Sequence, residues 1–312
     1  MTRVIFFGTP DPAAKALRRL TEDGYEVVAV YTQPDRKSGR VKTVQPTPVK
    51  LAALELGLTV NTPTDLRSEQ VFQDLTVASA DIFIVLAYGR LLPPKILKIP
   101  QGGVVNVHPS LLPLYRGPSP VVSAIRDGAS VTGVSVMLVN EGMDTGPILV
   151  QSPPVPIKDT DRADQLTDQL FTLGINLMIE SISAWQKGEI SALPQDDDVA
   201  TVTRLIAKSD GDLDFEMTAA EIARLIRAYH PWPGTFTRWN GRLLKILEAT
   251  ALDDTSGSPG VIKIHGGQCL IGTGGGTLRV ERLQLEGRGV VAATEFARGY
   301  PDIDGTLLRS AD

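Results

Sequence analysis

The first half of the chain alternates short apolar runs with stretches that carry helix signals. The apolar runs are VIFF, EVVAVYT, DIFIVLA, GGVVNVH and TGVSVMLV, and each has the length of one buried strand. Asp11 with Pro12, and then Thr47 with Pro48, are typical cap and first-turn residues of helices, and residues 161–187 are long enough for a further helix. Strands that are buried on both faces and separated by helices form a doubly wound sheet. The pattern therefore predicts an α/β domain with a mostly parallel sheet.

The sequence changes character after this first half. A polar stretch leads to a helical run, TAAEIARLIRAY, and to the turn PWPG. The runs TFTRW and RLLKILEA flank Asn240 and Gly241, the pair most typical of a tight hairpin. GTGGGT is expected to join two strands rather than to cradle a phosphate, because no helical run follows it. We predict an α/β domain over residues 1–188, a linker over 189–207 and a smaller antiparallel β-barrel or sandwich over 208–312.

Composition limits the classes of protein to which the chain can belong. It has 31 basic and 36 acidic residues, so any contact with nucleic acid must be local. Cys269 is the only cysteine, which excludes an internal disulfide framework and fits a reducing compartment. No apolar run reaches the roughly 18 residues of a membrane span, and VIFF is too short for the core of a signal peptide. We expect a cytoplasmic, monomeric protein with no membrane partner.

Polar side chains stand at the ends of two predicted strands, where a doubly wound sheet binds its ligands. Asn106 and His108 end the run GGVVNVH and share one face of an extended chain, and Asp144 follows the run TGVSVMLV. An amide can donate to an oxyanion, an imidazole can move protons and a carboxylate can orient it. A strand-end histidine and a turn-forming aspartate are the structural alternative.

Several other kinds of site are excluded by their missing signatures. There is no nucleophile elbow, no Walker loop and no cluster of His and Cys at metal-ligand spacing. The segment GTPD lacks the second and third glycines of a dinucleotide fingerprint, so a nicotinamide cofactor is not expected. Acyl transfer without a covalent enzyme intermediate is the chemistry that remains natural for the amide, imidazole and carboxylate.

The segment NVHPSLLPLYRGPSP, followed by MDTG, resembles the signature of the formyltetrahydrofolate-dependent formyltransferases. That family has a Rossmann-like N-terminal domain for formyl transfer and an OB-like C-terminal domain. The chain differs from some relatives at Pro109, Pro118 and Ser119, which restrict the loop and leave the catalytic positions intact. The resemblance implies 10-formyltetrahydrofolate as cosubstrate and no metal, with catalytic residues Asn106, His108 and Asp144 and folate-contacting residues Ser110, Leu111, Leu112 and Pro113.

Three further segments resemble the branch of this family that acts on methionyl-tRNA, namely FFGTPDPAA, TQPDRKSGRVKTVQPTPVK and IRAYHPWPG. The loop from Gln33 to Lys50 has five basic residues and only Asp35 as an acid, as phosphate neutralisation requires. A solvated charged loop is the structural alternative. Arg40 matches the family arginine that enters the acceptor-stem end. The resemblance implies tRNA contacts by Arg36, Lys37, Arg40 and Lys42.

These observations lead to one expected function and three alternatives. We expect formyl transfer from 10-formyltetrahydrofolate to the α-amino group of methionine on initiator methionyl-tRNA, for translation initiation. An α-amino group has a pKa of roughly 7.7–8.0, so its neutral fraction can attack the formyl carbon directly. A sugar-nucleotide N-formyltransferase and a formyltetrahydrofolate hydrolase share the same constellation. A non-catalytic RNA-binding protein is the alternative from another class.

Overall fold

The computed structural model describes residues 1–312 except 39–42, 255–256 and 310–312. The chain forms two compact units that are not continuous in sequence. The first contains residues 1–117, 133–155 and 168–202, and the second contains 118–132, 156–167 and 203–312. The linker and domain limits expected from the sequence remain a prediction. None of the helices in the described ranges is both long and apolar enough to cross a membrane.

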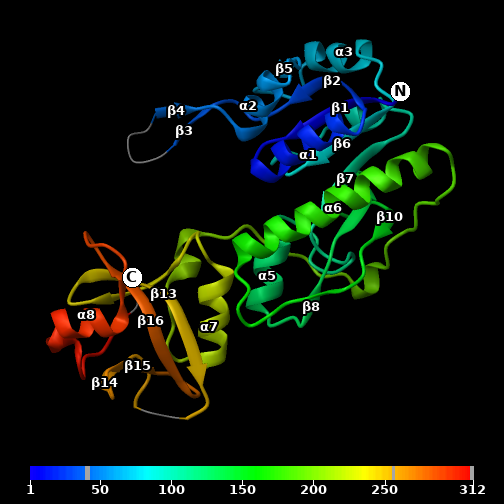
Figure 1. Cartoon of the computed structure of the whole chain (residues 1–312). Helices are drawn as coiled ribbons and strands as arrows, with labels where there is room; N and C mark the ends of the chain where they lie inside the picture. The colour runs from blue at the N-terminus through cyan, green and yellow to red at the C-terminus, as the bar shows by residue number, and fades with distance from the viewer. Residues whose placement is uncertain (39–42, 255–256, 310–312) are drawn as a thin grey trace. The chain divides into compact units, whose positions relative to one another are not determined.

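The first unit is built on a seven-stranded sheet in the order β10-β9-β7-β6-β1-β2-β5 (Figure 1). The strands from β7 to β5 are parallel, and β9 and β10 add an antiparallel edge, so the predicted mostly parallel sheet is confirmed. The bounds are β1 (Arg3–Gly8), β2 (Glu26–Tyr31), β5 (Val60–Asn61), β6 (Ile82–Leu86), β7 (Val104–His108), β9 (Ser135–Leu138) and β10 (Ile148–Gln151).

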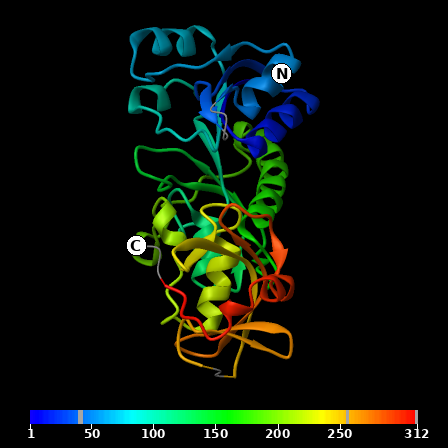
Figure 2. The ribbon, with the colours of Figure 1, turned by 90° about the vertical axis from the view of Figure 1, so that its left-hand side faces the viewer.

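Helices cover both faces of this sheet. A buried cluster joins Ile5, Phe7 and Phe83 of the strands to α3 and α4, whereas α1 packs on the other face and reaches α6 through the ion pair of Lys15 with Asp168. Figures 1 and 2 both show α6 running beside the strands, and residues 168–186 of this helix belong to the first unit. The bounds are α1 (Asp11–Glu22), α2 (Pro48–Glu55), α3 (Glu69–Val77), α4 (Pro94–Leu97) and α6 (Ala163–Gln186), with a 3-10 turn η1 (Asp197–Val199).

The helix starts expected from the sequence are partly correct. Thr47 caps α2, since its side chain accepts a hydrogen bond from Lys50 N, and Pro48 is the first helical residue as predicted. The cap of α1 was expected at Asp11, but Pro10 occupies the cap position and Asp11 is already helical. Asp11 still lies in the first turn, where a carboxylate interacts favourably with the helix dipole.

The second unit contains an antiparallel sheet in the order β12-β13-β16-β15-β14, with β17 paired to β16. The predicted antiparallel C-terminal domain is therefore confirmed. Asn240 and Gly241 join β12 to β13 with φ of 49° and 74°, as a tight hairpin turn requires, and GTGGGT joins β15 to β16. The bounds are β12 (Thr235–Trp239), β13 (Arg242–Leu252), β14 (Ile262–His265), β15 (Gln268–Gly272), β16 (Thr277–Leu285) and β17 (Val291–Ala292).

Helix α7 (Ala219–Ala228) packs on β13 and β16, and Figures 1 and 2 both place it beside that sheet. Its start is fixed by a capping box in which Thr218 and Glu221 bond each other's backbone N–H groups. The sequence TAAE, with Thr followed three residues later by Glu, is typical of such a capping box. The remaining elements are α5 (Pro120–Arg126), α8 (Ala293–Gly299), η2 (Lys208–Gly211), η3 (Pro301–Ile303), β8 (Val131–Thr132) and β11 (Val155–Pro156).

Gly174 lets α6 approach the sheet closely, and we expect Gly174→Ala to destabilise the protein. A Cβ there would collide with Val107 Cγ1 and lie 2.7 Å from Val134 Cγ1, both on stiff branched side chains. The crowding outweighs the better helix propensity of alanine, giving a net loss of about 1–2 kcal/mol in the free energy of unfolding. Denaturant titration measures this loss. Gly299→Ala, where a Cβ meets no atom within 4 Å, is the control and should not lower the midpoint.

Candidate active site

His108 is the last residue of β7 and lies on the same face of the strand as Asn106. Val107 points to the opposite face, against Gly174 of α6. His108 is buried, with 4% of its surface exposed, and Asn106 is half-buried. The alternation of a buried strand therefore places both polar side chains on the face away from α6, as expected from the sequence.

The His108 ring is held between a backbone carbonyl and a carboxylate. Nε2 lies 2.9 Å from Tyr115 O, and Nδ1 lies 3.6 Å from Asp144 Oδ2. A carbonyl oxygen can only accept, so Nε2 carries a proton and donates it to Tyr115 O. The nitrogen that faces Asp144 is therefore Nδ1. The ring thus stands between a hydrogen-bonded carbonyl and a carboxylate.

Asp144 reaches His108 from the loop between β9 and β10. Its Oδ2 accepts a hydrogen bond of 2.8 Å from Gly117 N, and its backbone has a φ of 54°, which aspartate tolerates better than most residues. Asp144 was expected at the same edge of the sheet as His108, because each follows a predicted strand of a doubly wound sheet. That reason is wrong, because β9 is antiparallel to β7 and Leu138 pairs with Val105. The loop after β9 instead folds back toward His108.

The side-chain amide of Asn106 makes no hydrogen bond to any described residue. A half-buried side-chain amide without a protein partner can donate to a ligand without first breaking an internal bond. The three predicted catalytic residues thus comprise a close His108–Asp144 pair and an amide on the same strand face as the imidazole.

The SLLP segment forms a tightly held turn after β7. The Ser110 hydroxyl donates to Leu114 O at 2.6 Å. The Leu112 N–H donates to Ser135 Oγ, and Leu112 O accepts from Gln151 Nε2. Ser110 and Leu112 are buried, whereas Leu111 and Pro113 are half-buried. Folate contact by these four residues remains a prediction.

The loops that follow β1, β2 and β6 are joined at the same edge of the sheet. Tyr88 O accepts hydrogen bonds from Thr9 Oγ1 at 2.9 Å and from Gln33 Nε2 at 3.1 Å. The Tyr88 hydroxyl is buried and has no hydrogen-bond partner among the described residues. Burial raises the pKa of Tyr88, and Arg90 opposes the shift, so the phenol stays neutral at neutral pH.

The basic segment expected to contact tRNA contains a hairpin that the sequence did not indicate. Strand β3 (Arg36–Ser38) pairs with β4 (Thr43–Gln45). Arg36 donates to Gln33 Oε1 at 3.2 Å, and Lys50 forms an ion pair with Asp35 at 2.7 Å. Lys37 lies in β3. Arg40 and Lys42 lie outside the described residues.

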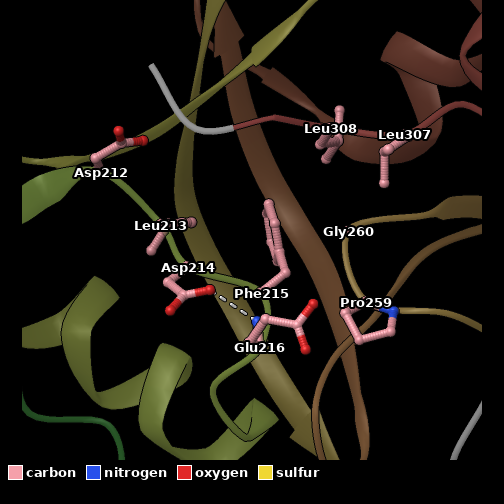
Figure 3. A pocket seen from close by; sticks show the side chains of 9 residues that line it. All are labelled: Asp212, Leu213, Asp214, Phe215, Glu216, Pro259, Gly260, Leu307 and Leu308. Carbon is pink, nitrogen blue, oxygen red and sulfur yellow. Dashed lines mark hydrogen bonds between the residues drawn. The ribbon is translucent and has the colours of Figure 1, made fainter. Parts of the chain in front are cut away.

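Three other features of the described chain bear on catalysis, namely its capacity to bind a metal, its cysteine thiol and a pocket outside the predicted site. No group of three or more His, Cys, Asp or Glu side chains within the described ranges could hold a metal ion. Burial raises the pKa of Cys269 to about 11, so its thiol is not a nucleophile at neutral pH. A pocket of about 450 Å³ lies in the second unit, and its lining contains none of the predicted site residues (Figure 3). Three carboxylates, Asp212, Asp214 and Glu216, make this pocket acidic.

The sequence of the chain matches family models over most of its length. Residues 2–182 match the family described as formyl transferase, and residues 205–301 match the formyl transferase C-terminal domain. The chain belongs to the formyl transferase family. This formyl transferase is 43% identical to the methionyl-tRNA formyltransferase of Chloroflexus aggregans, over 98% of its own length and 99% of the relative's. It is also 43% identical to the corresponding enzyme of a Roseiflexus species, over 99% and 96% of the two chains.

Solved structures share the fold of this formyl transferase. An N-formyltransferase from Helicobacter canadensis, in complex with folinic acid and dTDP-3-aminofucose, has a TM-score of 0.66 at 20% identity, over 90% of this chain and 99% of that one. HypX from Aquifex aeolicus, in complex with tetrahydrofolic acid, has a TM-score of 0.62 at 18% identity, over 96% of this chain and 47% of that one. At these identities the similarity is one of fold.

Three residues of this formyl transferase that lie beside the predicted catalytic residues were not anticipated from the sequence. Arg116, Gln195 and Thr201 bond the loops that hold His108 and Asp144. Arg116 stands within the recognised segment NVHPSLLPLYRGPSP but was given no role, and Gln195 and Thr201 lie in the stretch expected to be a linker. Arg116 could have been noticed as an arginine among apolar and proline residues. No signal in the sequence pointed to Gln195 or Thr201.

Proposed function

We propose that this formyl transferase moves the formyl group of 10-formyltetrahydrofolate to the α-amino group of methionine on initiator methionyl-tRNA. The single observation that carries the proposal is the 43% identity to methionyl-tRNA formyltransferases over nearly the whole length of both chains. The placement of His108 between Tyr115 O and Asp144 supports it, because formyl transfer needs a group that stabilises negative charge beside one that moves protons. The product serves translation initiation, and we propose a cytoplasmic location on that ground.

The proposed mechanism uses the neutral methionine amine as the nucleophile. The amine nitrogen attacks the formyl carbon, and the carbonyl electron pair moves onto oxygen to give a tetrahedral oxyanion. The Asn106 amide and the protonated His108 ring stabilise this oxyanion. Collapse of the intermediate breaks the bond to the folate nitrogen. The proton lost by the amine is relayed to the departing folate nitrogen through Asp144 and water, so no covalent enzyme intermediate is needed.

A panel of formyl acceptors tests the proposal. The purified chain is incubated with 10-formyltetrahydrofolate and, separately, with initiator methionyl-tRNA, with an amino-sugar nucleotide or with water alone. We expect rapid formylation of methionyl-tRNA and slow release of formate in water. Preferential formylation of the sugar nucleotide would assign the chain to sugar modification, and formate release as the main reaction would make it a hydrolase.

Arg40→Ala tests the proposed contact with tRNA. A cation that neutralises a phosphate of the acceptor stem adds affinity that depends on salt. We expect a roughly tenfold or greater fall in kcat/KM for methionyl-tRNA, with a salt dependence that is shallower by about one unit of slope. The dissociation constant of folate should not change. Arg67→Ala removes an exposed cation ahead of α3 and serves as the control. Parent-like kcat/KM across a salt titration of Arg40→Ala would make the loop a solvated surface feature.

A further inference from the structure

We propose that the segment which begins at Gln195 positions the formyl-transfer centre, because Gln195 holds Asp144 against His108 and Thr201 holds Tyr115, the other partner of the ring. This inference rests on the proposed function. Gln195 begins a segment, residues 195–202, that we call the clamp segment. Hydrogen bonds join the clamp segment to the backbone on both sides of the His108 ring, at the Asp144 loop and at the turn that contains Tyr115.

On the carboxylate side, Gln195 bonds two carbonyl groups of the Asp144 loop. Its Nε2 donates to Asp144 O at 2.8 Å and to Gly146 O at 2.7 Å. Asp144 has a φ of 54°, a conformation that non-glycine residues rarely adopt, so contacts from elsewhere must hold the loop in it. Gly146 packs so closely that a Cβ there would collide with Leu138 O. Both hydrogens of one amide group therefore fix the backbone that carries the Asp144 carboxylate.

Arg116 sets the orientation of the Gln195 amide. Its guanidinium is buried, and Arg116 Nε donates to Gln195 Oε1 at 2.9 Å while Nη2 donates to Asp197 Oδ1 at 2.7 Å. A guanidinium can only donate, so Gln195 must present its oxygen to Arg116 and its NH₂ group to the two carbonyls. The next residue, Gly117, donates its N–H to Asp144 Oδ2. Arg116 thus holds the Gln195 amide, and Gly117 holds the Asp144 carboxylate.

On the carbonyl side, Thr201 holds the other partner of His108. Thr201 Oγ1 accepts from Tyr115 N at 2.7 Å, and Tyr115 O accepts from His108 Nε2 at 2.9 Å. The backbone of Thr201 also bonds Arg116 N and Pro113 O. One short segment therefore positions both groups that flank the imidazole, so a shift of this segment changes the alignment of His108 with Asp144.

Gln195→Glu is the sharpest test, because it keeps the size and the acceptor for Arg116 but replaces the double donor by a carboxylate facing two carbonyls. We expect kcat for formylation to fall on the order of 10²-fold, as for a misalignment of about 1 Å, while KM for folate stays within about twofold. Gln73→Glu places the same change on the exposed surface of α3 and should keep the parent kcat. Parent-like kcat in Gln195→Glu, with KM altered or not, would overturn the proposal.

A double-mutant cycle separates positioning from general destabilisation. If Gln195 acts through Asp144, Gln195→Ala should lower kcat strongly in the parent but only slightly in an Asp144→Asn background. Equal fold-losses in both backgrounds would overturn the proposal. Should the Gln195 variants fold poorly, Thr201 supplies a second pair: Thr201→Ser keeps the Oγ acceptor and should keep kcat, whereas Thr201→Val should lose it. Equal kcat for that pair would also overturn the proposal.

The parent chain distinguishes a failure of this inference from a failure of the proposed function. When the parent formylates methionyl-tRNA and Gln195→Glu does so equally fast, only the positioning role fails. When the parent instead uses another formyl acceptor, the proposed function fails. The same kcat comparison is then made with that acceptor, and a fall of the same size still supports positioning by Gln195.

Discussion

His108→Ala is expected to lower the turnover number by about 10³- to 10⁴-fold, because it removes the charge that stabilises the oxyanion and the partner of Asp144. The ring is buried between Tyr115 O and Asp144, so no other described side chain takes its place. Its proposed role is confined to the transition state, and folate binding should therefore survive. Single-turnover kinetics and equilibrium binding of folate measure the two quantities separately.

The matched control for this variant is His265→Ala, which removes an exposed histidine from the end of β14. We expect this control to keep the parent turnover number. A His108→Ala protein that turns over normally would refute the proposed mechanism. If it lost folate binding while its residual turnover at saturating folate stayed high, His108 would be a binding residue instead.

Asp144→Asn is expected to lower the turnover number by about 10³-fold while the protein stays folded. The asparagine oxygen can still accept the hydrogen bond from Gly117 N, so the loop keeps its anchor. The negative charge that faces His108 Nδ1 is lost, however, and with it the group proposed to orient the ring and relay the proton. The measurement is kcat at saturating folate and methionyl-tRNA, together with the melting temperature.

Asp302→Asn provides the comparison, because it neutralises an exposed carboxylate in η3 of the second unit. This change should leave kcat unaltered. The role given to Asp144 would be untenable if the two asparagine variants had the same kcat. A large fall in melting temperature for Asp144→Asn alone would point to a structural role.

Local signals in the sequence predicted most of the fold. The buried runs became strands β1, β2, β6, β7 and β9, because a short apolar run between polar turns has few other ways to bury itself. Thr47 and the pair Asn240–Gly241 were placed correctly since caps and tight turns depend on neighbouring residues. The hairpin β3–β4 was missed because each strand is only three residues long and β3 has no apolar residue to mark it.

Features that depend on tertiary structure could not be read in the same way. The antiparallel direction of β9 is a property of the chain path, so the closeness of Asp144 to His108 was expected for the wrong reason. Residues 118–132 and 156–167 belong to the same compact unit as the C-terminal sheet, although they interrupt the sequence of the first unit. The contacts of Gln195 join residues about fifty positions apart and leave no local pattern.

Transfer of a labelled formyl group in a single turnover tests the central claim most directly. Excess chain is mixed with initiator methionyl-tRNA and 10-formyltetrahydrofolate labelled in the formyl carbon, and the reaction is stopped at successive times. We predict that the label moves from folate to the methionine amide, with one tetrahydrofolate released for each formylmethionyl-tRNA and no label on the protein. Label recovered as formate, or bound covalently to the chain, would contradict direct attack by the methionine amine.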